Sequence, residues 1–315
     1  MNINPNDSVG EALRTILRDL LAKIEVSAQQ VFLGPDPDHI HDLRVATRRT
    51  RTVLGQVPGV FQRTTIKPFR RGFKRVGNIT GTCRDLDVWL QAIDQDRGTS
   101  DANGTSPLSS LENLIRRHRD TARTQVVRNL QASWFPTLLH QWKSFLETPT
   151  KTLPAKASRA ITPVAAAQIL KAHQRLLKHG NALPEAPTAA QFHRLRIDGK
   201  KLRYLLEFFG SLFDPDRSHQ LIEDLKRLQD VLGGINDRKI QLNALDGLDE
   251  NQDPTVILAI ERHRLFLQDT LGSFHTTFAD QFRAFADTEV TLSFHHLLRS
   301  RSSVIDQFSL SEKGS

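Results

Sequence analysis

The hydrophobic positions of the chain recur with the period of an α-helix. Near the N-terminus, Leu13, Leu17 and Leu20 fall on one side of a helix, which is the spacing of an amphipathic segment. Ser8 precedes this run and Glu11 lies three residues after Ser8, the arrangement of a capping box. No stretch of useful length alternates with period two, as half-buried strands do. The pattern therefore predicts an all-α fold.

Breaks rich in Gly and Pro separate the predicted helices. Residues 34–38 read Gly-Pro-Asp-Pro-Asp, which ends the first helix, and Asp38 is the expected cap of the second. Pro58-Gly59 ends that second helix. Asp85 and Asp237 are expected to cap later helices, and this structural role is favoured over a catalytic one.

A Thr, Pro and Lys-rich linker at 148–156 divides the chain into two predicted halves, 8–147 and 156–286. Residues 287–315 follow as a tail that ends in Ser-Leu-Ser-Glu-Lys-Gly-Ser and is expected to fray. The helical pattern predicts further helices over 63–80, 108–147, 162–180, 189–212, 215–233, 237–248 and 254–285.

One predicted helix carries a row of basic side chains. Residues 40–54 read I-H-D-L-R-V-A-T-R-R-T-R-T-V-L. At 100° per residue, the apolar side of this helix contains Leu43, Thr50 and Leu54. Like charges three and four residues apart repel one another in an isolated helix, so a helix that keeps them aligned is expected to meet an anion. The aligned residues on the opposite side are His41, Arg44, Arg48 and Arg51.

The same stretch recurs 152 residues later, where 192–206 reads F-H-R-L-R-I-D-G-K-K-L-R-Y-L-L. Leu43 and Leu54 match Leu195 and Leu206 on the apolar side. Agreement of polar and apolar positions in one register indicates an internal repeat. The matching basic positions are His41 with His193, Arg44 with Arg196, Arg48 with Lys200, Arg49 with Lys201 and Arg51 with Arg203.

The repeat extends beyond this motif. Lys74-Arg75 matches Lys226-Arg227 at the same offset. Arg117-His118-Arg119 resembles Arg262-His263-Arg264 at an offset of 145, and the change of offset falls beside a loop-like run at 97–107. The chain is therefore interpreted as two copies of one helical unit.

These features resemble the CHAD family, the conserved histidine α-helical domain. The resemblance rests on H-x-L-R-V-x-x-R-R-x-R at 41–51, its second copy at 193–203 and the basic helices that follow each copy, and it covers roughly residues 8–285. It implies a single domain over 1–315, made of two antiparallel helical bundles related by a pseudo-twofold with a shared basic cavity. It also implies binding of inorganic polyphosphate and association with polyphosphate granules. Lys200 and Lys201 replace Arg in the second copy and lack its bidentate fork.

Composition agrees with a soluble protein that meets a polyanion. The 315 residues are 38% hydrophobic and 25% charged, with a net charge of +8 and a pI of about 9.9. This charge fits a polyanionic partner, and by itself it fits a merely basic surface equally well. The first residues lack a signal-peptide pattern, and the apolar runs are too short for a membrane span. Cys83 is the one cysteine and is expected to be a buried small hydrophobe, so we expect a reducing, cytoplasmic location.

The candidate phosphate contacts are the basic residues of both copies. Arg matches phosphate oxygens with a rigid fork and Lys with a point charge. Both motif histidines are interpreted as ligand contacts, the alternative being a structural hydrogen bond; neighbouring Arg disfavours charged imidazole until an anion binds. The predicted contacts are His41, Arg44, Arg48, Arg49, Arg51, Lys74, Arg75, Arg117, His193, Arg196, Lys200, Lys201, Arg203, Lys226 and Arg227.

Three function classes follow from the sequence. The first is a non-catalytic polyphosphate-binding module without metal or cofactor. The second is a nucleic-acid binder, which the charge also allows, although one Tyr and three Trp offer few stacking platforms. The third is an enzyme acting on phosphoanhydrides, which the lack of a phosphate loop and of an H-E-x-x-H motif disfavours. The sequence leaves the oligomeric state open.

Overall fold

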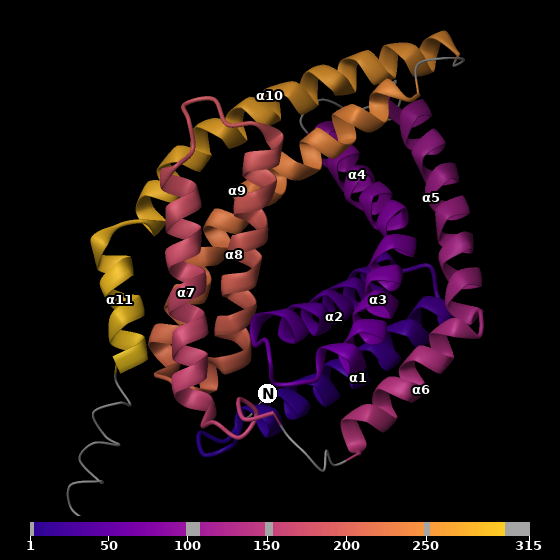
Figure 1. The fold of residues 1–315 in the computed structure, drawn as a ribbon. Helices are drawn as coiled ribbons and strands as arrows, with labels where there is room; N and C mark the ends of the chain where they lie inside the picture. The colour runs from indigo at the N-terminus through magenta and orange to yellow at the C-terminus, as the bar shows by residue number, and fades with distance from the viewer. Residues whose placement is uncertain (1–2, 99–107, 149–153, 249–252, 300–315) are drawn as a thin grey trace, which may run out of the picture.

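The computed structural model describes residues 3–98, 108–148, 154–248 and 253–299 (Figure 1). The described residues form helices and no strand, which confirms the all-α prediction. The helices of the first half are α1 (Val9–Leu33), α2 (Pro37–Gln56), α3 (Arg63–Ile79), α4 (Gly81–Gly98), α5 (Leu108–Gln131) and α6 (Trp134–Glu147). Those of the second half are α7 (Ile161–Asn181), α8 (Ala189–Phe209), the short 3-10 helix η1 (Gly210–Leu212), α9 (Pro215–Asp246), α10 (Pro254–Phe285) and α11 (Thr288–Arg299).

The first helix begins as predicted, and the second begins differently. The Ser8 hydroxyl accepts a hydrogen bond from the Glu11 amide, and the Glu11 carboxylate accepts one from the Ser8 amide, which completes the capping box. The prediction that Asp38 caps α2 is wrong. Asp36 is the cap and accepts a bond of 2.9 Å from the Asp38 amide, because Pro37 suits the first helical position and moves the start forward.

The predicted helix over 108–147 is two helices, α5 and α6. The break lies at Ala132 and Ser133. Pro136 explains it, because a proline has no amide hydrogen and its ring clashes with the carbonyl four residues earlier, which belongs to Ala132.

The predicted helices 215–233 and 237–248 form one continuous helix, α9. Asp237 therefore lies inside α9, and Asp85 lies inside α4, so the prediction that they are caps is wrong. Gly234 does not end the helix but lets α10 approach closely, since a Cβ there would lie 2.3 Å from Cζ of Phe274.

The predicted tail contains a further helix. α11 packs against α7 and α9, and it buries Phe294 and Leu297 in the core. The prediction that fraying starts at 287 is therefore wrong for 288–299, because two apolar residues one turn apart give this segment a face to bury. Residues 300–315 lie outside the described part of the chain.

The two halves share their hydrophobic core. The main cluster of buried side chains contains residues from both halves, and a smaller cluster joins α4 and α5 to α9 and α10. Cys83 is buried as predicted, and burial raises the pKa of its thiol to about 11. No helix in the described part of the chain combines the length and apolar composition that a membrane span requires.

Repeat-related residues meet beside the start of each half. Ser8 and Ala160, 152 residues apart, face each other in an isolated antiparallel bridge. The Val9 amide donates to the Arg159 carbonyl at 2.8 Å, and the Ile161 amide donates to the Asp7 carbonyl at 3.1 Å. A local twofold would produce this reciprocal pair of bonds. The pseudo-twofold of the whole domain and the division at 148–156 stay predictions.

Candidate functional site

A basic cavity of about 860 Å³ lies where α2 and α3 of the first half meet α7 and α8 of the second. Helices from both halves therefore supply its walls. Among the described residues that line it, Asp198 is the one acid. The eleven lining cations are Arg48, Arg51, Arg63, Lys67, Arg70, Arg71, Lys74, Lys171, Arg175, Lys200 and Lys201.

α2 presents Arg48 and Arg51 to the cavity because its opposite side is anchored in the core. Leu43, Thr50 and Leu54 are buried, as the helical spacing predicts. Burial lowers the pKa of the Arg51 guanidinium, and the positive charges of Arg70 and Arg48 lower it further. Such mutual repulsion is relieved when an anion enters.

α3 supplies the largest share of the cations. Ile66, Phe73 and Val76 are buried, which leaves a different side of the helix for Arg63, Lys67, Arg70, Arg71 and Lys74. The predicted contacts included only Lys74 of these five residues. Their helical spacing, which places all five on one side of α3, could have identified them from the sequence. Lys171 and Arg175 of α7 were also missed, and two cations one turn apart carry no comparable signal.

Lys200 is the most strongly perturbed cation of the cavity. It lies on α8, half-buried. Burial lowers the pKa of its amine to about 7, with Arg196 and Arg48 lowering it further and Asp237 opposing them. Close by, Arg48 Nε donates a hydrogen bond of 2.6 Å to the hydroxyl of buried Tyr204, which fixes one guanidinium at the cavity wall.

A second polar cluster lies beside the cavity, where α2 and α8 approach α4 and α9. Arg44 donates hydrogen bonds to the Gly77 carbonyl at 2.7 Å and to the Thr80 hydroxyl at 3.0 Å. Burial raises the pKa of Asp85, against the opposing charge of Arg44. Burial likewise lowers the pKa of Arg196. Neither Arg44 nor Arg196 lines the cavity; Arg44 is bonded to the end of α3.

The chain matches one known family, and its fold matches two solved structures. A CHAD domain family model matches residues 15–246. The chain belongs to the CHAD family. The crystal structure of the CHAD domain from the plant Ricinus communis is similar, with a TM-score of 0.75, 22% identity and coverage of 90% of this chain and 94% of that chain. PptA from Streptomyces chartreusis is also similar, with a TM-score of 0.69, 16% identity and coverage of 88% and 100%. At these identities the likeness shows the fold alone. No curated protein sequence matches the chain.

The histidines of the two CHAD motifs lie outside the cavity lining. Burial lowers the pKa of His41, and the charge of Arg84 lowers it further. His193 lies in an adjoining depression of about 480 Å³ that shares Arg175 and Lys201 with the cavity. Its Nδ1 is 3.3 Å from the Asn236 side-chain oxygen. Neither CHAD histidine is therefore part of the cavity wall, and His193 adjoins the cavity.

Three predicted contacts of the CHAD motifs or their flanks point elsewhere. Arg49 pairs with Glu207, and Arg203 Nε lies 3.3 Å from the same carboxylate. Arg75 stacks its guanidinium 4.0 Å above the Trp134 ring. These cations have partners inside the protein and do not line the cavity.

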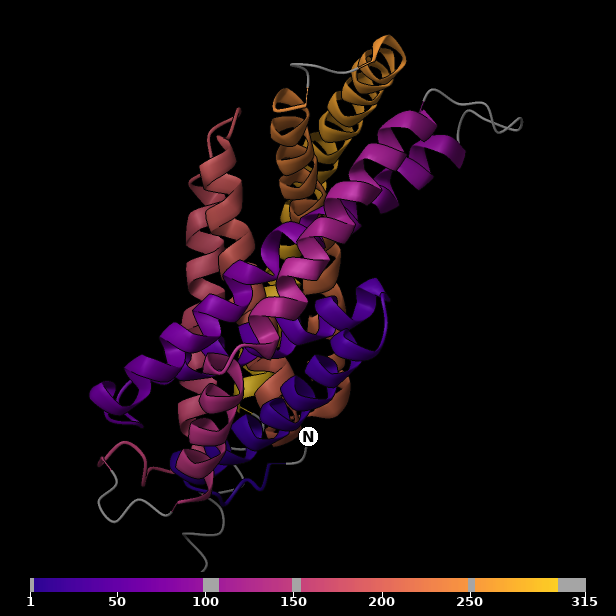
Figure 2. The same ribbon diagram turned by 90° about the vertical axis from the view of Figure 1, so that its right-hand side faces the viewer.

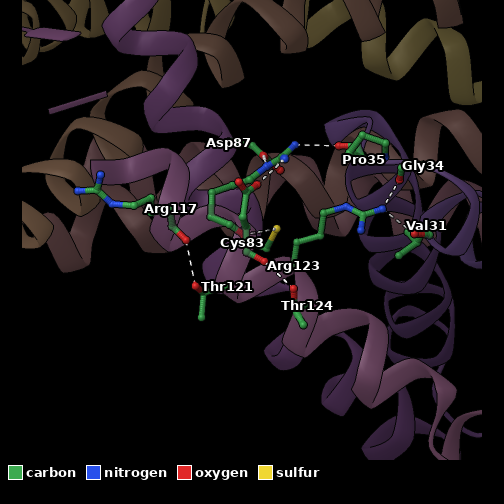
Figure 3. Close-up of polar contacts among 11 residues, drawn as sticks. Val31, Gly34, Pro35, Cys83, Asp87, Arg117, Thr121, Arg123 and Thr124 are labelled. Carbon is green, nitrogen blue, oxygen red and sulfur yellow. Dashed lines mark hydrogen bonds and ion pairs between the residues drawn. The ribbon is translucent and has the colours of Figure 1, made fainter. Parts of the chain in front are cut away.

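The remaining predicted contacts also lie outside the cavity. Lys226 bonds Glu223 at 2.6 Å, and Arg227 pairs with Asp224, both on α9. Arg117 is exposed on α5 and extends away from the side on which Arg123 bonds the end of α1, as Figure 3 shows. Of the fifteen predicted contacts, the cavity brings together Arg48, Arg51, Lys74, Lys200 and Lys201.

Proposed function

We propose that this CHAD domain is a non-catalytic module that binds inorganic polyphosphate in the cavity between α2, α3, α7 and α8. The observation that carries the proposal is the convergence of eleven cations from both halves on a space with one lining carboxylate, among the described residues. That carboxylate, Asp198, already lies 2.6 Å from His179 Nδ1 and 3.7 Å from Lys201 Nζ. The cavity therefore lacks counter-charges that an anion could supply.

The ligand chemistry follows from the kind of cation and its spacing. Each unit of a polyphosphate carries negative charge, so a linear polyanion matches a row of cations better than a single phosphate does. Guanidinium forks bind two phosphate oxygens at once, while the lysines act as point charges. Cations of α3 and α7 face one space from opposite halves, so a long chain neutralises both. On this proposal the protein is cytoplasmic and associates with polyphosphate granules.

Nucleic acid is the competing polyanion. Proteins that bind single strands usually offer aromatic faces on which bases stack. Tyr204 is the aromatic residue of the cavity lining, and it is 2% exposed. Trp142 and Trp89 are also buried. Phosphate contacts without base stacking favour polyphosphate over DNA or RNA at this site.

Titration with a long polyphosphate tests the proposal. We expect binding by the wild type and weaker competition from DNA, RNA, ATP and triphosphate. An R70A/R71A/K74A variant should bind about 10 to 100 times more weakly, if each screened contact contributes roughly 0.5–1 kcal/mol. The matched control, R128A/K143A/R217A, removes three exposed cations outside the cavity and should bind like the wild type. Equal losses in both variants, or DNA outcompeting polyphosphate, would contradict the proposal.

A further inference from the structure

The surfaces on the two sides of α2 and α8, the helices that carry the CHAD motifs, differ in charge. α2 contacts α3 on one side and α1 on the other, and α8 contacts α7 and α9 in the same way. Figure 2 shows α7 on one side of the molecule and α1 and α9 on the other. The offset of 152 relates α3 to the first part of α9 and α7 to α1, so the cavity has a repeat-related surface formed by α1, α2, α8 and α9.

Alignment of α1 with α7 is secure because their buried positions coincide. Val9 and Ile161, Leu17 and Ile169, and Ile24 and Leu176 are each 152 residues apart, and all six are buried. The same offset can therefore be used to compare the charges. Cations of the cavity are replaced as follows on the second surface: Arg63 by Pro215, Arg70 by Ile222, Arg71 by Glu223 and Lys171 by Asp19.

Two of the cations that the second surface retains have carboxylate partners. Lys23 lies 3.0 Å from Asp19, and Lys226 lies 2.6 Å from Glu223. Both acids occupy positions where the cavity has a cation. The two surfaces therefore differ by more than the number of cations, because Asp19 and Glu223 also pair with neighbouring lysines.

A third acid on the second surface is Glu207. Glu207 occupies the position that corresponds to Gly55 in the cavity wall, and its carboxylate pairs with both Arg49 and Arg203. Glycine at 55 provides neither bulk nor a counter-charge. On the cavity side, none of Arg51, Arg70 or Lys74 has a carboxylate within ion-pair distance among the described residues.

We propose that polyphosphate docks on the α3–α7 side of the domain only, and that the repeat-related α1–α9 side is a charge-compensated face that does not bind it. This inference rests on the proposed function and adds an orientation to it. An anion gains less on the second face, because the carboxylates beside the cations repel it and offset part of their attraction. One face binds the polyanion and the other stays free of it, in spite of the repeated sequence.

Lysine footprinting on the wild-type protein tests this orientation without any substitution. Exposed amines are acetylated with and without a long polyphosphate, and each site is measured by mass spectrometry. Lys67, Lys74 and Lys171 are expected to be protected several-fold, while Lys23 and Lys226 are modified equally in both samples. Equal protection on the two faces would overturn the inference. Wild-type protein that fails to bind at all would instead refute the proposed function.

Exchange of the repeat-related charges gives an independent test. R71E/K171D gives the cavity the acids of the second face and should weaken binding at least about tenfold. D19K/E223R gives the second face the cations of the cavity and should add a second binding equivalent in the titration. R128E/R217E is the control for net charge. Thermal melts establish that each variant is folded. Unchanged binding by R71E/K171D, with wild-type binding intact, would refute one-sided docking and leave the proposed function standing.

Discussion

We predict that Lys200 makes polyphosphate binding depend on pH in a range where ordinary lysines do not titrate. In the free protein its pKa is lowered to about 7 by burial and by the charges of Arg196 and Arg48. Phosphate oxygens beside the amine favour the charged form and move its pKa back up. At a pH between these two pKa values, the Lys200 amine is neutral in the free protein and charged in the complex. Binding therefore takes up a proton, and affinity should fall as pH rises.

The size of the effect follows from linkage. If the pKa returns from about 7 to the ordinary 10.5 in the complex, the affinity at pH 7 exceeds that at pH 9 by about 50-fold. This figure is the upper limit for complete recovery of the ordinary pKa. A bound pKa of 9 would still give a factor of about 25 over the same interval.

Titration calorimetry in buffers of different ionisation enthalpy measures both the affinity and the proton uptake. A long polyphosphate is used, because its internal units stay ionised throughout. K200R keeps its charge at every pH and should give a flat profile with near-wild-type affinity. K200M should give a flat pH profile and a weaker affinity. A wild-type profile as flat as that of K200R, with no proton uptake, would refute the assignment of a titrating amine at this position.

Three further outcomes follow from the structure. Binding should weaken steadily with ionic strength; titration in a salt series checks this, and a salt-independent affinity would contradict an electrostatic cavity. Arg44→Ala removes the hydrogen bond to the Gly77 carbonyl and should cost roughly 1–3 kcal/mol of unfolding free energy; denaturant melts would show no change if this contact were unimportant. Gly234→Ala places a methyl group against Phe274 and should destabilise the fold by about 1–3 kcal/mol, with Gly233→Ala, whose Cβ meets nothing within 4 Å, as the matched control in the same melts.

The helical class, most helix positions and the buried side of each motif helix could be predicted from the sequence. Leu43, Leu54, Leu195 and Leu206 are all buried, because the side of a helix on which a residue lies depends only on local geometry. The boundaries beside Pro37 and Pro136 depend on local proline chemistry and could have been predicted. The continuity of α9 depends on a contact outside the segment. Nothing local distinguishes a glycine that ends α9 from Gly234, which is needed for contact with α10.

The predicted ligand contacts likewise depend partly on local sequence and partly on tertiary packing. The sequence by itself determined that two helices carry a basic side, and this placed Arg51 and Arg203 in equivalent roles. Only the tertiary structure decided that Arg51 lines an open cavity while Arg203 pairs with Glu207. It also brought Lys171 of α7 to the same cavity. The physical reason is that helical periodicity is a local property of the chain, whereas the charge at a site sums over every side chain that packing brings within a few ångströms.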